Sequence, residues 1–140
     1  RRPSEMYASN VEGTRNVLQA AWETGVEKIV YTSTVGTIGL NEQKQPANET
    51  SFLQNDARTA HYKKSKFLAE QEAVRFAQRG LPVVIVNPST PVGSHDWKPT
   101  PTGKMILDFL NRRMPMYLDT GLNLVEVEDI AEGHLLAAKK

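Results

Sequence analysis

Two short apolar runs constrain the fold of this 140-residue chain more than any other feature. Residues 28–33 and 81–86 are rich in β-branched and aromatic side chains. Such continuous runs are typical of strands that are buried on both faces of a parallel sheet. Each follows a segment with helical apolar spacing, residues 5–24 and 60–79, and a glycine closes each segment. The order helix, strand, helix, strand predicts an α/β fold, a doubly wound parallel sheet with right-handed crossovers.

Two polar stretches separate or follow these elements, and we expect both to be loops. Residues 40–59 are rich in Asn, Gln, Pro and Glu, and residues 88–101 are rich in Pro, Gly, Ser and Thr. Connections of this length inside a compact domain are usually functional or mobile. They are therefore candidates for contact with a ligand.

The last forty residues predict smaller elements. Thr102 can cap a helix that extends to about Arg113, and residues 116–118 and 124–127 have the composition of short strands. Asp129 can open a last helix, with its carboxylate near the positive end of the helix dipole. We expect a helical cap, rather than catalysis, to be the role of Asp129.

Tyr62 and Lys66 are four residues apart on the second predicted helix, so their side chains lie on one helix face. An ordinary phenol has a pKa of about 10, and a fixed ammonium nearby favours the phenolate. A tyrosine in that setting can exchange a proton with an alcohol or a carbonyl near neutral pH. The pattern is short, however, and by itself it fits a surface helix equally well.

Small polar side chains follow both predicted strands. In doubly wound sheets, ligands bind beyond the carboxyl ends of the strands. The residues at these ends are Thr32, Ser33 and Thr34 after the first strand and Asn87, Pro88, Ser89 and Thr90 after the second. Their hydroxyl and amide groups suit hydrogen bonding to a ligand, although ordinary strand-end hydrogen bonding would use the same residue types.

Composition excludes several other classes of protein. A net charge of +1 and 7% aromatic residues give no reason to propose nucleic-acid binding, and no apolar run approaches the ~20 residues of a membrane span. The absence of cysteine excludes disulfides and thiolate metal sites, and we expect a cytoplasmic protein. His61, His95 and His134 have no ligand spacing, so we expect no metal site.

Several motifs, in order along the chain, resemble those of the extended short-chain dehydrogenases/reductases, the NAD-dependent epimerase/dehydratase family. The helix motif N-V-x-G-T-x-N-x-L matches residues 10–18, and the motif Y-x-x-x-K matches Tyr62 to Lys66. The family's S/T-S-S/T strand end, its post-strand loop and its V-x-V-x-D-V-A segment are similar to residues 32–34, 86–93 and 124–131.

Residues 87–103 and 117–123 most resemble the hopanoid-associated sugar epimerases, bacterial relatives of dihydroflavonol 4-reductases and sugar-nucleotide epimerases. The resemblance implies a Rossmann-like fold and an oxidoreductase that uses NAD or NADP. It also implies hydride transfer at a carbinol or ketone carbon of a small molecule, a sugar nucleotide or a related ketone or alcohol. The epimerase, dehydratase and reductase activities all stay open.

The resemblance also assigns roles to the catalytic residues. Tyr62 is expected to be the acid/base, and Lys66 to support its ionised form and hold the nicotinamide ribose. Thr34 takes the place of the hydroxyl that bonds the reacting oxygen, and so it also contacts the substrate.

The other implied roles concern binding. Asn87 is expected to face the substrate. The residues expected near the cofactor, besides Tyr62 and Lys66, are Asn10, Thr32, Ser33, Pro88 and Ser89.

One family feature is missing from residues 1–140: the N-terminal βαβ unit whose glycine-rich turn holds the pyrophosphate. The chain also starts without methionine and stops within a helical pattern, so we expect an incomplete Rossmann-like domain from a longer protein. Residues 1–140 would be its central part, with residues 94–140 leading into the substrate-binding region. The alternatives are a catalytically inert fragment and a non-catalytic NAD(P)-sensing module. A homodimer through the helices at 5–24 and 60–79 is a further expectation.

Overall fold

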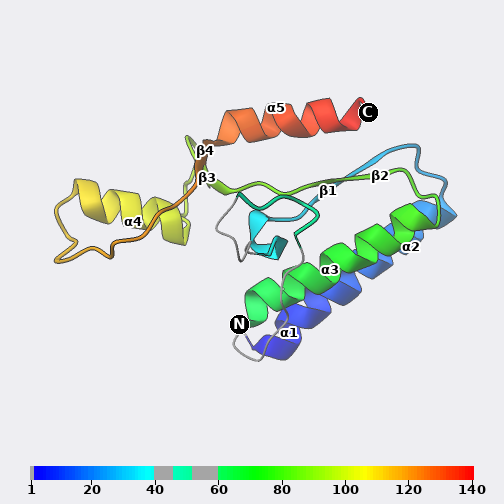
Figure 1. The fold of residues 1–140 in the computed structure, drawn as a ribbon, viewed down its shortest axis with the longest axis horizontal. Helices are drawn as coiled ribbons and strands as arrows, with labels where there is room; N and C mark the ends of the chain where they lie inside the picture. The colour runs from blue at the N-terminus through cyan, green and yellow to red at the C-terminus, as the bar shows by residue number, and fades with distance from the viewer. Residues whose placement is uncertain (1, 40–45, 52–59) are drawn as a thin grey trace.

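The computed structural model describes residues 2–39, 46–51 and 60–140. Its centre is a parallel pair of strands, β1 (Ile29–Thr32) and β2 (Val83–Val86), in which Ile29 pairs with Val83 and Thr32 with Val86. Helices lie on both sides of this pair, as Figure 1 shows. The parallel pairing and the helical layers confirm the predicted α/β class.

The first helical segment is continuous but not uniform. It consists of α1 (Pro3–Tyr7), a π turn (Ala8–Glu12) and α2 (Gly13–Glu23). Together with α3 (His61–Gln78) it packs on one side of the strands, while α5 (Val127–Ala138) contacts β1 and β2 from the other side (Figure 1). Both predicted helices are therefore confirmed.

The core lies between α2, α3 and the strand pair. Leu18, Ala73, Phe76 and Leu81 are buried and in mutual contact. The residues packed against them from the strands are partly buried: Ile29, Tyr31, Val83 and Ile85. The strands are less buried than their sequences predict, because within the described residues each has only one neighbouring strand.

A second strand pair follows. β3 (Thr90–Val92) runs parallel to β4 (Leu124–Glu126), and the loop prediction for this part of residues 88–101 is wrong. Residues 116–118, predicted to be a strand, form none. β3 depends on a partner more than thirty residues away in sequence, so the local Pro- and Thr-rich composition does not indicate it.

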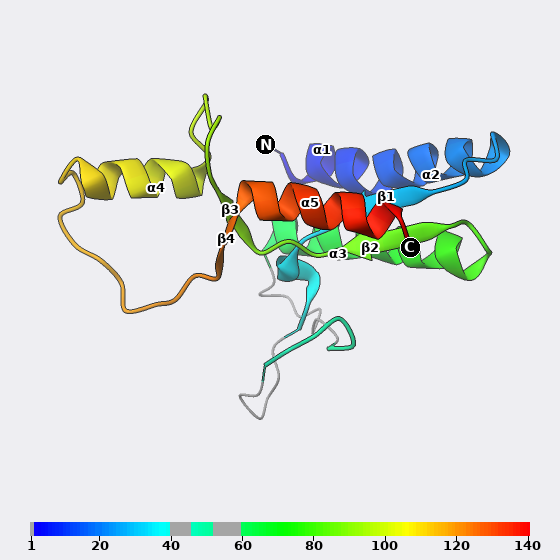
Figure 2. The ribbon, with the colours of Figure 1, turned by 90° about the horizontal axis from the view of Figure 1, so that it is seen from above.

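The helix α4 (Pro101–Leu110) begins before its predicted cap and ends before its predicted end. Thr100, not Thr102, is the N-cap, because its side chain accepts a hydrogen bond from the backbone N–H of Gly103 and Pro101 fits the first helical position. Arg112 takes a φ of 54°, which ends the helix. Figure 2 shows α4 lying apart from the helices that pack on β1 and β2.

The last helix starts at Val127, with Glu126 at the N-cap position. Asp129 lies in its first turn, where a carboxylate stabilises the helix through the dipole rather than as the cap. The predicted loop 40–59 is described only at residues 46–51, so most of that prediction lies outside the described residues. None of the helices described is long and apolar enough to cross a membrane.

Candidate active site

Lys66 reaches from α3 to the carboxyl end of β1. Its Nζ lies 3.5 Å from the carbonyl oxygen of Thr32 and 6.0 Å from the centroid of the Tyr31 ring. Tyr62 is one turn earlier on the same helix, and its side chain is 55% exposed. The phenol is therefore accessible from solvent.

The three hydroxyls after β1 have different surroundings. Thr32 Oγ1 lies 2.9 Å from Nε2 of His134 on α5. Ser33 Oγ is buried and has no hydrogen-bond partner among the described residues. Thr34 Oγ1 accepts a hydrogen bond of 3.2 Å from the backbone N–H of Gly36, in the short 3₁₀ helix Val35–Thr37.

Asn10 connects the π turn to α3. Its Nδ2 donates a 2.9 Å hydrogen bond to Ser65 Oγ, and Ser65 in turn donates to the carbonyl oxygen of Tyr62, also at 2.9 Å. Ser65 is fully buried between the two helices. Single π turns inside helices often mark functional sites, and this one directs the amide of Asn10 at Ser65, whose hydroxyl bonds to the backbone of Tyr62.

The segment after β2 lies at the same edge as the segment after β1. The carbonyl oxygen of Pro88 accepts a 2.9 Å hydrogen bond from the backbone N–H of Val35. Ser89 Oγ lies 3.4 Å from Asn123 Oδ1. Asn87 directs its Nδ2 inward to Glu70 Oε2, at 2.7 Å. Pro88 is thereby held beside the chain that follows Thr34, and Ser89 faces the second strand pair.

Tyr31, whose ring lies 6.0 Å from the Lys66 ammonium, is a poor candidate for proton transfer. Burial raises the pKa of Tyr31, although a hydrogen bond with Thr14 opposes the shift, and the charge of Glu70 raises the pKa further. Tyr31 therefore stays protonated near neutral pH. Tyr62, on the exposed end of α3, is the better candidate.

The residues at this edge fit the nicotinamide–ribose end of a dinucleotide. A buried hydroxyl without a protein partner, such as Ser33 Oγ, is normally satisfied by a ligand or water. The ammonium of Lys66 carries three hydrogens and makes one long hydrogen bond, to Thr32. In the described ranges we find no glycine-rich turn that opens a helix to hold a pyrophosphate, and no cluster of three ligands for a metal.

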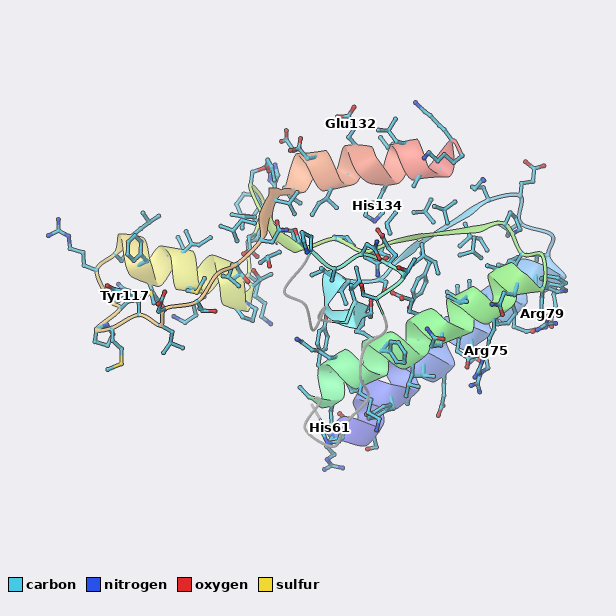
Figure 3. All side chains as sticks on the ribbon, viewed as in Figure 1. His61, Arg75, Arg79, Tyr117, Glu132 and His134 are labelled. Atoms are coloured by element: carbon cyan, nitrogen blue, oxygen red, sulfur yellow. The ribbon has the colours of Figure 1, made fainter. Side chains whose placement is uncertain are left out.

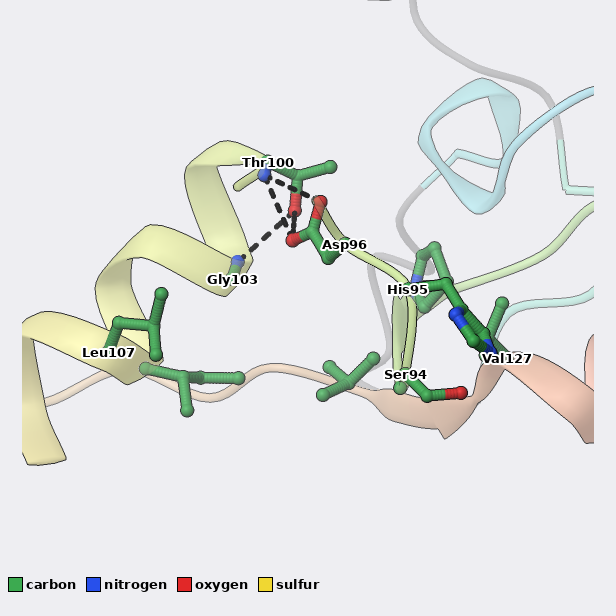
Figure 4. Close-up of a pocket in the computed structure, with 11 residues that line it drawn as sticks. Ser94, His95, Asp96, Thr100, Gly103, Leu107 and Val127 are labelled. Carbon is green, nitrogen blue, oxygen red and sulfur yellow. Dashed lines mark hydrogen bonds between the residues drawn. The ribbon is translucent and has the colours of Figure 1, made fainter. Parts of the chain in front are cut away.

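A cavity with a volume of about 450 Å³ lies apart from this edge, between β3, α4 and the start of α5. Its wall is mostly apolar and includes Val92, Ile106, Leu107 and Val127, with Ser94, His95 and Asp96 at one side (Figure 4). The Asp96 carboxylate already accepts hydrogen bonds from the N–H and hydroxyl of Thr100. None of the predicted catalytic residues lines this cavity.

The sequence did not indicate roles for Glu70, Ser65 or His134, which all contact the candidate site. Tyr62, Lys66 and Glu70 follow one another at four-residue intervals on α3. This spacing could have indicated that Glu70 lies on the same helix face as the other two. The partners of Ser65 and His134 are distant in sequence, and no local pattern reveals them.

Comparison with known proteins gives consistent results. The model of the NAD dependent epimerase/dehydratase family matches residues 1–140. The chain is 54% identical over 132 residues to the Synechocystis sp. protein named "Putative dihydroflavonol 4-reductase", covering 94% of this chain and 38% of that protein. It is 35% identical over 136 residues to sterol demethylase protein B of Methylococcus capsulatus, covering 97% of this chain and 41% of that protein.

Solved structures agree. The crystal structure of gox2253 has a TM-score of 0.92 and 52% identity, over 99% of this chain and 42% of the other. That of a nucleoside-diphosphate-sugar epimerase from Pseudomonas aeruginosa has a TM-score of 0.86 and 26% identity, over 96% of this chain and 45% of the other. The chain thus spans 38% to 45% of the length of these four relatives.

Proposed function

Because the chain belongs to the NAD dependent epimerase/dehydratase family, with the Rossmann-like fold of its relatives, we propose that the full-length protein is a nicotinamide-dependent oxidoreductase. Its substrate would be a small molecule with a carbinol or ketone carbon. The observation that carries this proposal is the approach of Lys66 Nζ to the carbonyl of Thr32, which places a cation at the end of β1; the next residue, Ser33, has a buried hydroxyl with no hydrogen-bond partner among the described residues.

Each side chain has a distinct task in this proposal. Tyr62 takes the proton of the substrate hydroxyl, or returns it to the carbonyl oxygen in the reverse direction. Thr34 steadies the same oxygen through its hydroxyl. Its Oγ1 accepts from Gly36 N–H, so its own hydrogen is available to donate to the substrate. Lys66 supplies positive charge at the end of β1, where its Nζ lies 3.5 Å from the carbonyl oxygen of Thr32.

The same edge would hold the nicotinamide end of the cofactor, which supplies a hydride acceptor or donor when bound. Lys66 would donate to the ribose hydroxyls, and the buried Ser33 hydroxyl would find its missing partner there. Thr32, Pro88 and Ser89 border this position. Asn10 acts indirectly, because its amide bonds to Ser65, and the hydroxyl of Ser65 bonds to the backbone carbonyl of Tyr62.

The substrate class is open between two kinds of molecule named by the relatives. One is a dihydroflavonol-like ketone or alcohol, and the other is a nucleoside-diphosphate sugar. We place the substrate between the Tyr62 edge and the segment after β3, which leads to the apolar cavity at α4. Four further expectations stay predictions: pairing of two copies through α2 and α3, a cytoplasmic location, a hopanoid-related substrate, and the use of either NAD or NADP.

A catalytically inert binding module is the second candidate. It needs only the groups at the strand edge that suit a dinucleotide, the Lys66 ammonium and the Ser33 hydroxyl, and no proton transfer by Tyr62. The two candidates differ in turnover, since a binding module would retain dinucleotide affinity and show no hydride transfer with any substrate.

Replacement of Tyr62 in the full-length protein tests the proposal. Tyr62→Phe removes the proton carrier and keeps the ring, so turnover of nicotinamide should fall by a factor of about 100 or more. Dinucleotide affinity, measured by fluorescence titration, should change by no more than a few-fold. The matched control is Tyr7→Phe on α1, whose hydroxyl lies 3.4 Å from His61 Nδ1. Turnover in Tyr62→Phe equal to that of the control would contradict the assignment.

A further inference from the structure

A closed set of hydrogen bonds joins α3 to the chain on either side of the candidate site. Glu70 Oε2 accepts from Thr37 Oγ1 at 2.8 Å and from Asn87 Nδ2 at 2.7 Å. Asn87 Nδ2 also lies 3.0 Å from Thr37 Oγ1 and 3.3 Å from the carbonyl oxygen of Thr34. Three elements therefore meet at one carboxylate: α3, the 3₁₀ helix and the end of β2.

The cluster has three hydrogens to donate, and they are shared among five short contacts. Thr37 offers one O–H and Asn87 offers two N–H groups. The acceptors are the Glu70 carboxylate, the Thr37 hydroxyl oxygen and the carbonyl oxygen of Thr34, which also lies 2.7 Å from Thr37 Oγ1. Thr37 is 3% exposed, so water cannot readily replace these bonds. Loss of the carboxylate would remove the acceptor shared by Thr37 and Asn87, and their hydrogens would have to turn to the carbonyl oxygen of Thr34 and to each other.

The cluster fixes the position of Thr34 relative to α3. The two N–H groups of Asn87 can donate to the carbonyl oxygen of Thr34 and to Glu70, and the single hydroxyl hydrogen of Thr37 is shared between the same two acceptors. Glu70 lies on the helix face that carries Tyr62 and Lys66, one turn beyond Lys66. The distance between the proposed proton carrier and the hydroxyl of Thr34 is therefore set through one rigid helix and one short network.

We propose that Glu70 is a positioning residue for the reaction, and that it holds the Thr34 hydroxyl in register with Tyr62 through Thr37 and Asn87. The inference rests on the proposed function. It also gives Asn87 a task different from substrate contact, because the amide nitrogen of Asn87 faces Glu70 and Thr37. Glu70 acts without touching the reacting atoms.

Substitution of Glu70 in the full-length protein tests this role. Glu70→Ala should lower kcat by about 10- to 100-fold, because a misplacement of about 1 Å at a reacting group costs about that much. Dinucleotide affinity should stay within a few-fold, since Ser33 and Lys66 are unchanged. Glu70→Gln keeps an acceptor of the same size and should restore kcat to within about fivefold of the parent.

Glu72 provides a matched control on the same helix. Its side chain is mostly buried, with 9% exposed. Its carboxylate bonds to Arg15 and Arg75 and not to the cluster around Thr34. Glu72→Ala should lower the melting temperature and leave kcat within about twofold at a temperature where the variant is folded. An equal loss of kcat in Glu70→Ala and Glu72→Ala would overturn the proposal, because stability alone would then explain both.

Thr37→Val keeps the proposal testable if Glu70→Ala does not fold. It removes one hydroxyl from the network with little change in shape, and kcat should fall about tenfold while dinucleotide affinity is retained. A Thr37→Val enzyme with unchanged kcat would overturn the inference.

The variants also distinguish failure of the positioning role from failure of the proposed function. If Tyr62→Phe abolishes turnover but Glu70→Ala and Thr37→Val do not, only the positioning role fails. If Tyr62→Phe is fully active, the proposed function itself fails.

Discussion

Nε2 of His134 lies 2.9 Å from Oγ1 of Thr32, which joins side chains that are 102 residues apart in sequence. Nδ1 of the same ring lies 2.7 Å from the carbonyl oxygen of Ile130. A carbonyl only accepts, so Nδ1 carries the hydrogen, and in the neutral ring Nε2 accepts from the Thr32 hydroxyl. Figure 3 shows His134 directed from α5 toward the strands, with Glu132 directed away. α5 therefore holds the end of β1 from the side opposite α3, and the Thr32 hydroxyl faces α5.

Removal of this imidazole should loosen the end of β1. His134→Ala deletes the partner of a partly exposed hydroxyl, so the free energy of unfolding of the full-length protein should fall by about 1 kcal/mol. Urea unfolding measures the difference. His61→Ala, at an exposed position at the start of α3, is the control and should change stability by less than about 0.5 kcal/mol. Equal effects of the two substitutions would show that the His134–Thr32 bond adds no stability.

Two glycines give opposite expectations for substitution by alanine. Gly80 ends α3 with a φ of 105°, and no atom lies within 4 Å of an added Cβ, so only backbone strain opposes the change. Gly80→Ala should therefore cost about 1–2 kcal/mol of stability. Gly133 is helical and exposed within α5, also with free space, so Gly133→Ala should add about 0.5–1 kcal/mol. Chemical unfolding of both variants checks the pair, and a shift in the same direction would contradict it.

Glu72 should make stability depend on pH. Hydrogen bonding from Arg15, with the charges of Arg15 and Arg75, lowers the pKa of Glu72 below the ordinary value of 4.5, and partial burial opposes the shift. The unfolded chain then binds a proton at higher pH than the folded chain does. This contribution to stability is fully present above pH 4.5 and is lost as the pH falls through the lowered pKa of the folded state.

Glu72→Gln tests this dependence. At pH 7 the variant should be less stable than the parent by about 1 kcal/mol, because glutamine keeps one acceptor oxygen but removes the negative charge that the two exposed guanidinium groups face. The gap should narrow as the pH is lowered below 4.5, where the parent carboxylate becomes protonated as well. Guanidinium unfolding at several pH values measures the gap. A gap that is constant with pH would show that ionisation of Glu72 does not contribute to it.

Much of the first half of the fold follows from local sequence. Apolar spacing of 3.6 residues and a terminal glycine predict α3, and the glycines at 25 and 80 take positive φ values as expected. Continuous β-branched runs predict β1 and β2 and their parallel pairing. β3 was missed because its stability comes from pairing with Leu124–Glu126, and that information is not contained in the strand's own residues.

The candidate site could be predicted only in part. The four-residue spacing of Tyr62 and Lys66 and the hydroxyls after β1 are visible in the sequence, and the structure brings Lys66 to Thr32. The direction in which each polar side chain points could not be predicted from the sequence. Substrate contact by Asn87 stays a prediction, and no local pattern indicates that its amide nitrogen bonds to Glu70, which the packing of α3 against β2 brings close.

The π turn at Ala8–Glu12 has a consequence for the angular register of the first helical segment. A π turn contains one residue more than an α-helical turn. The side chains after it are therefore rotated about the helix axis by about 100° relative to those before it, compared with a helix that lacks the extra residue. Deleting a single residue there would rotate Tyr7 away from His61, or else rotate Arg15 away from Glu72 at the other end of the segment. Natural variation in the length of this segment should therefore be rarer than substitution within it, since an insertion or deletion disturbs both contacts with α3 at once.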